Sequence, residues 1–138
     1  DGERLLLIHK RTGLGAGKVN APGGRIDPGE TAEEAAIREV REEVGVEASG
    51  LTRAGELSFQ FVDGYALHGT VFFASTHSGT PHATREADPF WCPVDEIPYE
   101  RMWEDDRYWL PLALEGKPFR AFFAFDGDRM LSRRIDLD

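Results

Sequence analysis

The sequence contains little cysteine, has a deficit of positive charge and lacks any long apolar run. Its single cysteine, Cys92, excludes an internal disulfide and is typical of a reducing compartment, so we expect a cytoplasmic protein. No apolar run reaches the roughly 20 residues that span a bilayer and no signal peptide is recognisable, so we expect no membrane partner. The 16 Lys and Arg residues stand against 25 Asp and Glu residues, and the net charge of −9 argues against binding of DNA or RNA polymers.

The length of the chain favours one domain. Its 138 residues can build one proper hydrophobic core but hardly two, so we expect a single domain over residues 1–138. The composition, 41% apolar and 30% charged, is typical of a soluble globular protein, and nothing demands more than a monomer. The chain opens on Asp1-Gly2, a hairpin-turn dipeptide, which implies a preceding strand that the sequence lacks.

The spacing of apolar residues predicts a mixture of strands and helices. We expect strands at 4–9, 56–62, 66–76, 91–94, 119–125 and 130–137, and helices at 31–45 and 104–114. Residues 13–24 form a glycine-rich loop, and Asp63-Gly64 turns the second strand towards the third. In that second strand, Leu57, Phe59 and Phe61 lie on one face. The fold class expected from this order is α+β with a mixed sheet.

The first helix has clear end signals. Thr31 is a suitable N-cap and Glu34 completes a capping box, while Gly45 is where a left-handed residue would end the helix. Glu34 and Arg38 are spaced as a supportive ion pair. An apolar stripe facing a core is formed by four residues spaced four apart, Ala32, Ala36, Val40 and Val44.

Three carboxylates share one face of this helix. Glu39, Glu42 and Glu43 are three and four residues apart, and like charges so placed cost about 0.2–0.5 kcal/mol per pair. A divalent cation bound between the three carboxylates would offset their repulsion, so the cluster is a candidate metal site. Carbonyls of the turns at 22–24 and 27–29 could add oxygen ligands. Oxygen ligands select Mg²⁺ or Mn²⁺ over zinc. The alternative is a solvated acidic helix face.

Residues 24–46 read GRIDPGETAEEAAIREVREEVGV, which matches the pattern G-x5-E-x7-R-E-U-x-E-E-x-G-U, with U apolar, at every position. The chain therefore resembles the Nudix hydrolase family. The resemblance implies a Nudix fold, in which a mixed sheet is sandwiched between helices in α/β/α layers. It also implies a hydrolase that cuts a phosphoanhydride bond with the help of Mg²⁺, with Mn²⁺ as a substitute.

The resemblance also implies residue roles. Metal ligands would be the carbonyl of Gly23 and the carboxylates of Glu39, Glu42 and Glu43. The proton of the attacking water would be taken by one of three carboxylates, Glu39, Glu43 or Glu86. Glu86 lies outside the motif, and its alternative role is that of a solvated loop carboxylate. Structural roles within the motif fall to Gly24, Glu30 and Arg38, the last two as an ion pair that orients the helix.

The remaining stretches narrow the resemblance to one branch of the family. GLGAGKVNAPGG, GELSFQFVDG, DEIPYERMWEDDRYWLPL and FRAFFAFDG are similar to the animal oxidised-purine nucleoside triphosphatases, which act on 8-oxo-dGTP. By that resemblance, Trp103 stacks on the purine while Asp105 and Asp106 hydrogen-bond its edge. Asn20 also contacts the base, and Phe59 and Phe61 form pocket walls. The expected activity converts 8-oxo-dGTP or 2-oxo-dATP to the monophosphate plus pyrophosphate and so cleans the nucleotide pool.

The two neighbouring aspartates suggest how oxidised bases are distinguished. Two adjacent carboxyls in a sheltered site are not both ionised, so one holds a proton. A protonated carboxyl donates and an ionised one accepts, so moving the proton would suit either an oxidised guanine or an oxidised adenine. On pattern alone, Asp105 or Asp106 is instead a helix N-cap.

Several positions depart from the animal pattern and leave the substrate open. Pro22 stands where those enzymes have an aromatic, and Leu14 replaces a pocket phenylalanine. Leu67-His68 and Ala87 stand where pocket methionines are expected. Lys10 could meet a phosphate or be an ordinary surface lysine. The alternatives are hydrolysis of ADP-ribose, of a dinucleoside polyphosphate or of unmodified or methylated dNTPs, and a Nudix-fold binding module without turnover.

Overall fold

The computed structural model describes residues 4–137. Their backbone forms two compact units: the first contains the residues up to Thr52 together with Ala74–Met102, and the second contains Arg53–Phe73 together with the residues from Trp103 onward. The predicted turn at Asp1-Gly2 lies outside the described residues, and the single domain over residues 1–138 stays a prediction. Within the described part, no helix is long and apolar enough to cross a membrane.

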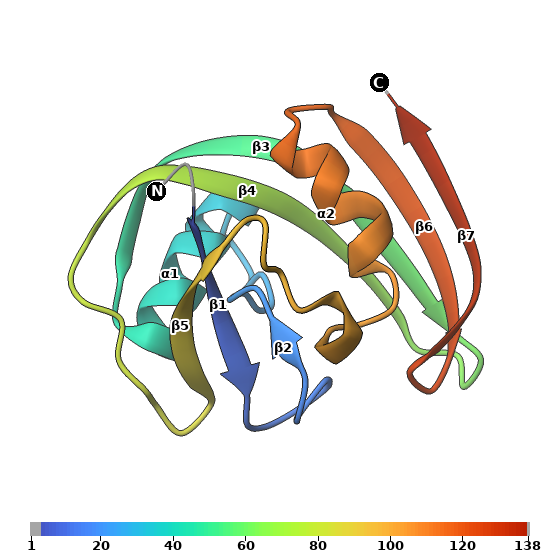
Figure 1. Cartoon of the computed structure of the whole chain (residues 1–138), viewed down its shortest axis with the longest axis horizontal. Coiled ribbons are helices and arrows are strands. Elements are labelled where there is room, and N and C mark those ends of the chain that lie inside the picture. The colour runs from blue at the N-terminus through green and yellow to red at the C-terminus, as the bar shows by residue number, and fades with distance from the viewer. Residues whose placement is uncertain (1–3, 138) are drawn as a thin grey trace. The chain divides into compact units, whose positions relative to one another are not determined.

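The first unit is built around a three-stranded antiparallel sheet and one helix (Figure 1). The strands are β1 (Arg4–Lys10), β2 (Val19–Asn20) and β5 (Ala87–Pro93), in the order β2-β1-β5. Helix α1 (Ala32–Val44) packs on β5, and a short 3-10 helix, η1, spans Tyr99–Arg101. The core is formed by buried residues of β1, α1 and β5 and their neighbours: Ile8, Val44, Val46 and Ala87, with Leu6 and Val40 partly buried against them.

The second sheet has four strands in the order β4-β3-β6-β7. Strand β3 (Glu47–Phe61) runs parallel to β6 (Phe119–Asp126), which pairs antiparallel with β7 (Arg129–Leu137), so this sheet is mixed. The strands β3 and β4 (Ala66–Ser78) contribute residues to both units. In the second unit, helix α2 (Asp106–Leu114) packs on β6 through Trp109, whose ring stacks on Phe119 at 5.8 Å. The predicted α+β class with a mixed sheet is confirmed.

Both ends of α1 are as predicted. The amide of Glu34 donates to Thr31 Oγ1 at 3.1 Å and the amide of Thr31 donates to Glu34 Oε1 at 2.8 Å, which completes the capping box. Gly45 has a φ of 78°, the left-handed geometry that ends the helix. Because Glu34 is engaged with the cap, Arg38 contacts other acidic residues instead of the predicted partner.

The apolar stripe of α1 is partly different from our prediction. Val44 and Val40 belong to the core, but Ala35 is the fully buried alanine, and Ala32 and Ala36 are only half-buried. Glu43 is buried beside Val44 although it is charged. The helix is therefore rotated so that part of its acidic face, and not only its apolar stripe, is turned away from solvent.

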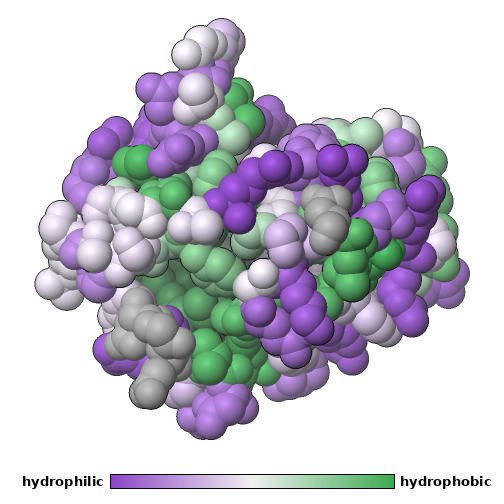
Figure 2. Space-filling view, turned by 90° about the horizontal axis from the view of Figure 1, so that it is seen from above, coloured by the Kyte–Doolittle hydropathy of each residue, from purple (hydrophilic) through white to green (hydrophobic). Residues whose placement is uncertain are grey.

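Several strands begin earlier than their apolar patterns suggest. Strand β3 begins at Glu47 instead of residue 56, because residues 47–55 pair as a strand without any apolar alternation. Leu57 and Phe61 are buried and Phe59 is half-buried, as the alternation predicts. Strand β5 begins at Ala87, not residue 91, and β2 lies inside the predicted glycine-rich loop. On the face shown in Figure 2, hydrophilic residues are interrupted by apolar patches.

Candidate active site

The centre of the first unit's candidate site is a buried carboxylate. Glu43 is 1% exposed and its Oε1 accepts a hydrogen bond of 2.7 Å from the amide of Gly23. Burial raises the pKa of Glu43, and the nearby negative charges of Glu39 and Glu86 act in the same direction, although the Gly23 hydrogen bond and Lys10 oppose them. Burying a charge with so little compensation is unfavourable unless a cation binds beside it.

Arg38 organises the other acidic residues of the motif. Its guanidinium makes a two-pronged pair with Glu30, with Nε–Oε2 at 2.7 Å and Nη2–Oε1 at 3.0 Å. Its Nη1 also lies 2.8 Å from carboxylate oxygens of both Glu39 and Glu42, and Nη2 donates to the carbonyl of Arg25 at 2.8 Å. The hydrogen bond from Arg38 holds the pKa of Glu30 at about 2. This geometry agrees with the structural role predicted for Glu30 and Arg38.

Gly24 is the point where the loop before α1 meets Glu39. A Cβ atom at position 24 would lie 2.2 Å from Glu39 Cδ and from its Oε2, whereas a Cβ at Gly23 would meet nothing within 4 Å. The missing side chain of Gly24 is therefore what lets the carboxyl group of Glu39 lie against the loop. The sequence pattern indicates a glycine here, but only the structure gives its reason.

As placed, the carboxylates do not form a closed metal centre. Among residues 4–137, no group of three or more His, Cys, Asp or Glu side chains is close enough to hold a metal ion. Arg38 supplies the positive charge beside Glu39 and Glu42, while Glu43 is held by Gly23. The set is nevertheless made of hard oxygen donors around a buried anion, which fits Mg²⁺ or Mn²⁺. Glu39 and Glu42 would have to turn from Arg38 towards the ion.

Two residues from outside the motif complete this region. Glu86 is exposed in the loop before β5, yet its charge is close enough to raise the pKa of Glu43. The charge of Lys10, at the end of β1, acts on Glu43 in the opposite direction. The structure therefore brings both predicted residues near Glu43. Their roles as general base and phosphate contact stay predictions.

The second unit contains an aromatic cluster around Trp103. The Trp103 ring meets Phe61 edge-on at 6.2 Å and Phe125 edge-on at 5.5 Å, and Phe61 stacks on Phe125 at 5.8 Å. Phe59 stacks on Phe123 at 5.7 Å. The three predicted aromatics are therefore brought together, and β6 adds two that sequence reasoning did not single out. Their alternation in the run FRAFFAF was the signal that could have identified them.

Asp105 and Asp106, which follow Trp103 closely in the sequence, are both buried. Asp105 is 2% exposed and Asp106 is 8% exposed. Asp105 occupies the predicted N-cap position of α2, but its side chain makes no cap hydrogen bond: its Oδ2 accepts from Trp109 Nε1 at 2.8 Å instead. The spacing of four residues between Asp105 and Trp109 could have indicated this bond.

Burial also changes the protonation of the two aspartates. It raises the pKa of Asp105 to about 6, and it raises that of Asp106, with help from the charge of Asp105, to about 8. Near neutral pH the pair therefore retains a proton, as the sequence suggested. Oδ1 of Asp105 is buried without a hydrogen-bond partner among the described residues. A buried acceptor of this kind is suited to a ligand that donates a hydrogen bond.

The other two predicted base-contacting residues belong to the first unit. Asn20 lies in β2, and its Nδ2 is buried without a hydrogen-bond partner among the described residues. That amide nitrogen is suited to a ligand acceptor. Leu14 lies in the loop between β1 and β2 and is 50% exposed. Both stay predictions as substrate contacts.

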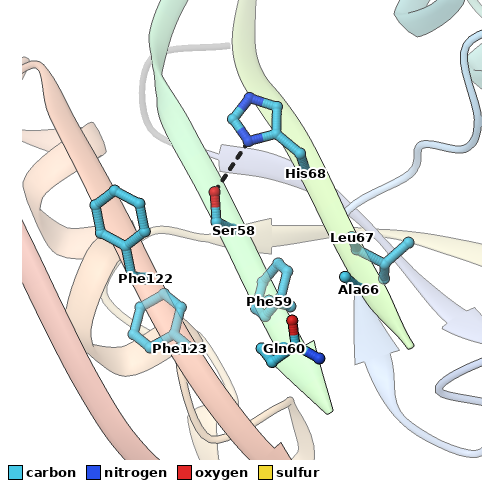
Figure 3. A pocket seen from close by; sticks show the side chains of 8 residues that line it. All are labelled: Ser58, Phe59, Gln60, Ala66, Leu67, His68, Phe122 and Phe123. Atoms are coloured by element: carbon cyan, nitrogen blue, oxygen red, sulfur yellow. Dashed lines mark hydrogen bonds between the residues drawn. The ribbon is translucent and has the colours of Figure 1, made fainter. Parts of the chain in front are cut away.

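An open pocket of about 460 Å³ lies on the sheet of the second unit (Figure 3). Ser58, His68 and Phe122 are among its lining, and Ser58 Oγ lies 2.9 Å from His68 Nδ1. His68 also contacts Glu56 at 3.2 Å, so it is an exposed strand histidine held by polar neighbours. Of the predicted base-pocket residues, Phe59 is the one in this lining, among the residues that the structure describes.

Comparisons with known proteins agree on one family. Residues 1–113 match the family model described as the NUDIX domain. The chain is 42% identical over 139 residues to the oxidized purine nucleoside triphosphate hydrolase of Mus musculus, covering 97% of this chain and 89% of that protein. It is 39% identical over 135 residues to the Danio rerio protein of the same name, covering 96% and 86%.

Among solved structures, the chain is similar to the crystal structure of a MutT protein from Bacillus halodurans. That likeness has a TM-score of 0.85 at 27% sequence identity and covers 97% of this chain and 90% of that one. The Nudix fold that the sequence resemblance implied is confirmed.

Proposed function

Because the chain belongs to the NUDIX domain family, we propose that this hydrolase converts oxidised purine nucleoside triphosphates, such as 8-oxo-dGTP or 2-oxo-dATP, to the monophosphate plus pyrophosphate. The names of the mouse and zebrafish relatives support this substrate class. The observation that carries the proposal is the buried Glu43, held by Gly23 with Glu39 and Glu86 nearby. Such a group of carboxylates is suited to a divalent cation and to the phosphates that the cation would bring.

Hydrolysis requires charge neutralisation on the phosphate oxygens and a water aimed at phosphorus. We propose Mg²⁺, with Mn²⁺ as a substitute, as the cation that neutralises this charge and makes water more acidic. Its ligands would be the carbonyl of Gly23 and the carboxylates of Glu39, Glu42 and Glu43. Glu86 is exposed and not engaged by Arg38, so it is suited to take the proton of the attacking water. Lys10, whose charge acts on the same region, would then meet a phosphate.

Base recognition would use the second unit's aromatic cluster and aspartates. An indole such as Trp103 offers a stacking face worth about 1–3 kcal/mol for a base. Asp105 offers an unpartnered acceptor, and Asp106 is suited to donate a hydrogen bond because its raised pKa, about 8, keeps it protonated at neutral pH. Asn20 would contact the base through Nδ2, which has no hydrogen-bond partner in the described part of the chain. Phe59, Phe61 and Leu14 would line the pocket.

This assignment of the aspartates can be tested by exchanging carboxyl groups for amides. Asp106→Asn keeps a donor but fixes it, so we expect the ratio of kcat/KM for 8-oxo-dGTP to that for 2-oxo-dATP to change by about tenfold, which corresponds to one hydrogen bond. Asp105→Asn should change the same ratio. Asp136→Asn, which removes a half-exposed carboxylate of β7 in the same unit, is the matched control. An unchanged ratio in both site variants would contradict the assignment.

The single cysteine supports a cytoplasmic location, and the acidic charge supports a small nucleotide and not a nucleic acid polymer as the ligand. We propose a monomer because nothing in the sequence demands more. The alternatives differ in substrate: ADP-ribose, a dinucleoside polyphosphate, or unmodified or methylated dNTPs. A binding module without turnover is disfavoured because a protein that only binds a ligand has no need of the intact set of metal-binding carboxylates, with Glu43 buried among them.

A further inference from the structure

The segment 82–87, between β4 and β5, closes over the end of α1. The amide of His82 donates to the carbonyl of Val44 at 3.0 Å, and Thr84 Oγ1 donates to the carbonyl of Glu43 at 2.6 Å. Carbonyls in the last turn of a helix have no partner within the helix, so another segment must satisfy them. Here the segment that does so also carries Glu86.

Thr84 makes hydrogen bonds to the backbone of both Glu43 and Glu86. Its Oγ1, while donating to the Glu43 carbonyl, accepts from the amide of Glu86 at 3.3 Å. Its own amide donates to the carbonyl of Ala87 at 2.8 Å. One hydroxyl group thus links the backbone of Glu43 in α1 to the backbone of Glu86 in the loop.

Strand β1 fixes the same loop from the other side. Arg11, directly after β1, donates through Nη1 to the carbonyl of Thr84 at 2.7 Å and through its amide to the carbonyl of Glu86 at 2.9 Å. Thr84 is half-buried, whereas Glu86 is exposed. The exposed carboxylate is therefore carried on a backbone whose position is set by hydrogen bonds to α1 and to Arg11.

The geometry points to Thr84 as a positioning residue: its hydroxyl group fixes the Glu86 backbone relative to Glu43 and so holds the Glu86 carboxylate at the catalytic centre. The inference rests on the proposed hydrolysis and adds to it a residue that the motif does not contain. A catalytic group displaced by about 1 Å can lose on the order of 10²-fold in rate, so one hydrogen bond of this kind has a measurable effect.

The test uses the full chain and two conservative changes at one position. Thr84→Val removes the hydroxyl group and keeps the shape, and Thr84→Ser keeps the hydroxyl group. Thr76→Val is the matched control, because it removes a threonine hydroxyl that bonds Ser49 at 2.6 Å on an exposed part of the same unit. Each variant is also combined with Glu86→Gln. The readouts are kcat and KM for 8-oxo-dGTP, and the Kd for Mn²⁺ measured by electron paramagnetic resonance without nucleotide.

We expect Thr84→Val to lower kcat by about 10- to 100-fold with little change in KM, because binding of the nucleotide does not use this loop. The Kd for Mn²⁺ should rise several-fold, because a negative charge moves away from the ion. Thr84→Ser should restore both values, and Thr76→Val should change neither. In the Glu86→Gln background, Thr84→Val should have no further effect, because the residue through which it acts is already disabled.

Two outcomes would overturn the inference. If Thr84→Val has no more effect than Thr76→Val, the hydroxyl group of Thr84 does not position Glu86. If Thr84→Val has the same effect with and without Glu86→Gln, Thr84 has a general structural role instead. If the wild-type protein hydrolyses no nucleotide, the proposed function fails, and the Mn²⁺ affinities alone decide the inference. A weaker Mn²⁺ affinity in Thr84→Val supports the inference if Thr84→Val causes no such weakening in the Glu86→Gln background. An unchanged Mn²⁺ affinity in Thr84→Val refutes it.

Discussion

Two adjacent glycines give a sharp test of the site geometry. A Cβ at position 24 would lie 2.2 Å from Glu39 Cδ, whereas a Cβ at position 23 would meet nothing within 4 Å. Neither glycine has a positive φ, so the backbone of both positions accepts alanine without strain. Gly24→Ala and Gly23→Ala therefore differ in one respect, which is the collision with the carboxyl group of Glu39.

The size of the effect follows from that distance. Relief of the contact from 2.2 Å to the 3.4 Å of an ordinary Cβ contact moves the Glu39 carboxyl group by more than 1 Å. The added methyl group would also occupy space beside Glu39 as its carboxyl group turns towards the ion, and a misplacement of about 1 Å costs on the order of 10²-fold in rate. The colliding atoms lie at the far end of the flexible Glu39 side chain, so this side chain can move without a change in the backbone. Replacing glycine by alanine also stabilises the folded state by about 0.4–1 kcal/mol, because it lowers the conformational entropy of the unfolded chain. Stability should therefore change little while activity falls strongly.

The assay measures kcat on 8-oxo-dGTP with Mg²⁺ and the free energy of unfolding in urea for both variants. We expect Gly24→Ala to lose about 10²-fold in kcat at near-wild-type stability, and Gly23→Ala to lose no more than a few-fold. The reasoning is refuted if Gly24→Ala is as active as the wild type. It is also refuted if Gly23→Ala loses as much activity, because the contact with Glu39 would then not be the cause.

Three further predictions concern stability and one concerns binding. Gly45→Ala should destabilise by about 1–2 kcal/mol in urea unfolding, because Gly45 has a φ of 78° and its Cβ would lie 2.0 Å from the His82 ring. Thr31→Ala should cost about 1 kcal/mol in the same assay through loss of the helix cap. Because the pKa of Asp106 is raised to about 8, the folded chain holds a proton on this side chain that the unfolded chain loses near pH 4. The free energy of unfolding should therefore fall as the pH rises from about 4 to 8. Urea titrations of Asp106→Asn should show a smaller fall. Trp103→Ala should raise KM for 8-oxo-dGTP roughly 5- to 150-fold in steady-state kinetics; an unchanged KM would exclude stacking on this ring.

The features of α1 that could be predicted from sequence are those set by local chemistry. A cap side chain and a left-handed glycine act within one turn of the helix, so Thr31 and Gly45 could be assigned from spacing alone. The pairing of Glu30 with Arg38 came from the family resemblance, and its two-pronged geometry agrees with it. The partner expected from i, i+4 spacing, Glu34, was wrong because the cap had already engaged it.

What the sequence missed depends on contacts between distant segments. Thr84 has no motif of its own, and its role appears only because residues 82–87 return to the end of α1. Strand β3 extends to Glu47 because pairing of its backbone does not need apolar alternation. Asp105 looked like a helix cap because an aspartate at a helix start usually is one, but burial and Trp109 decide otherwise.

The central claim is hydrolysis of oxidised purine nucleoside triphosphates by the site around Glu43. The most direct measurement is kcat/KM for 8-oxo-dGTP, 2-oxo-dATP, dGTP and ADP-ribose with Mg²⁺, for the wild type and for Glu43→Gln. We predict a strong preference for an oxidised purine triphosphate over dGTP and ADP-ribose, with release of pyrophosphate, and loss of that activity in Glu43→Gln. Equal rates on dGTP, a preference for ADP-ribose, or full activity in Glu43→Gln would contradict the account.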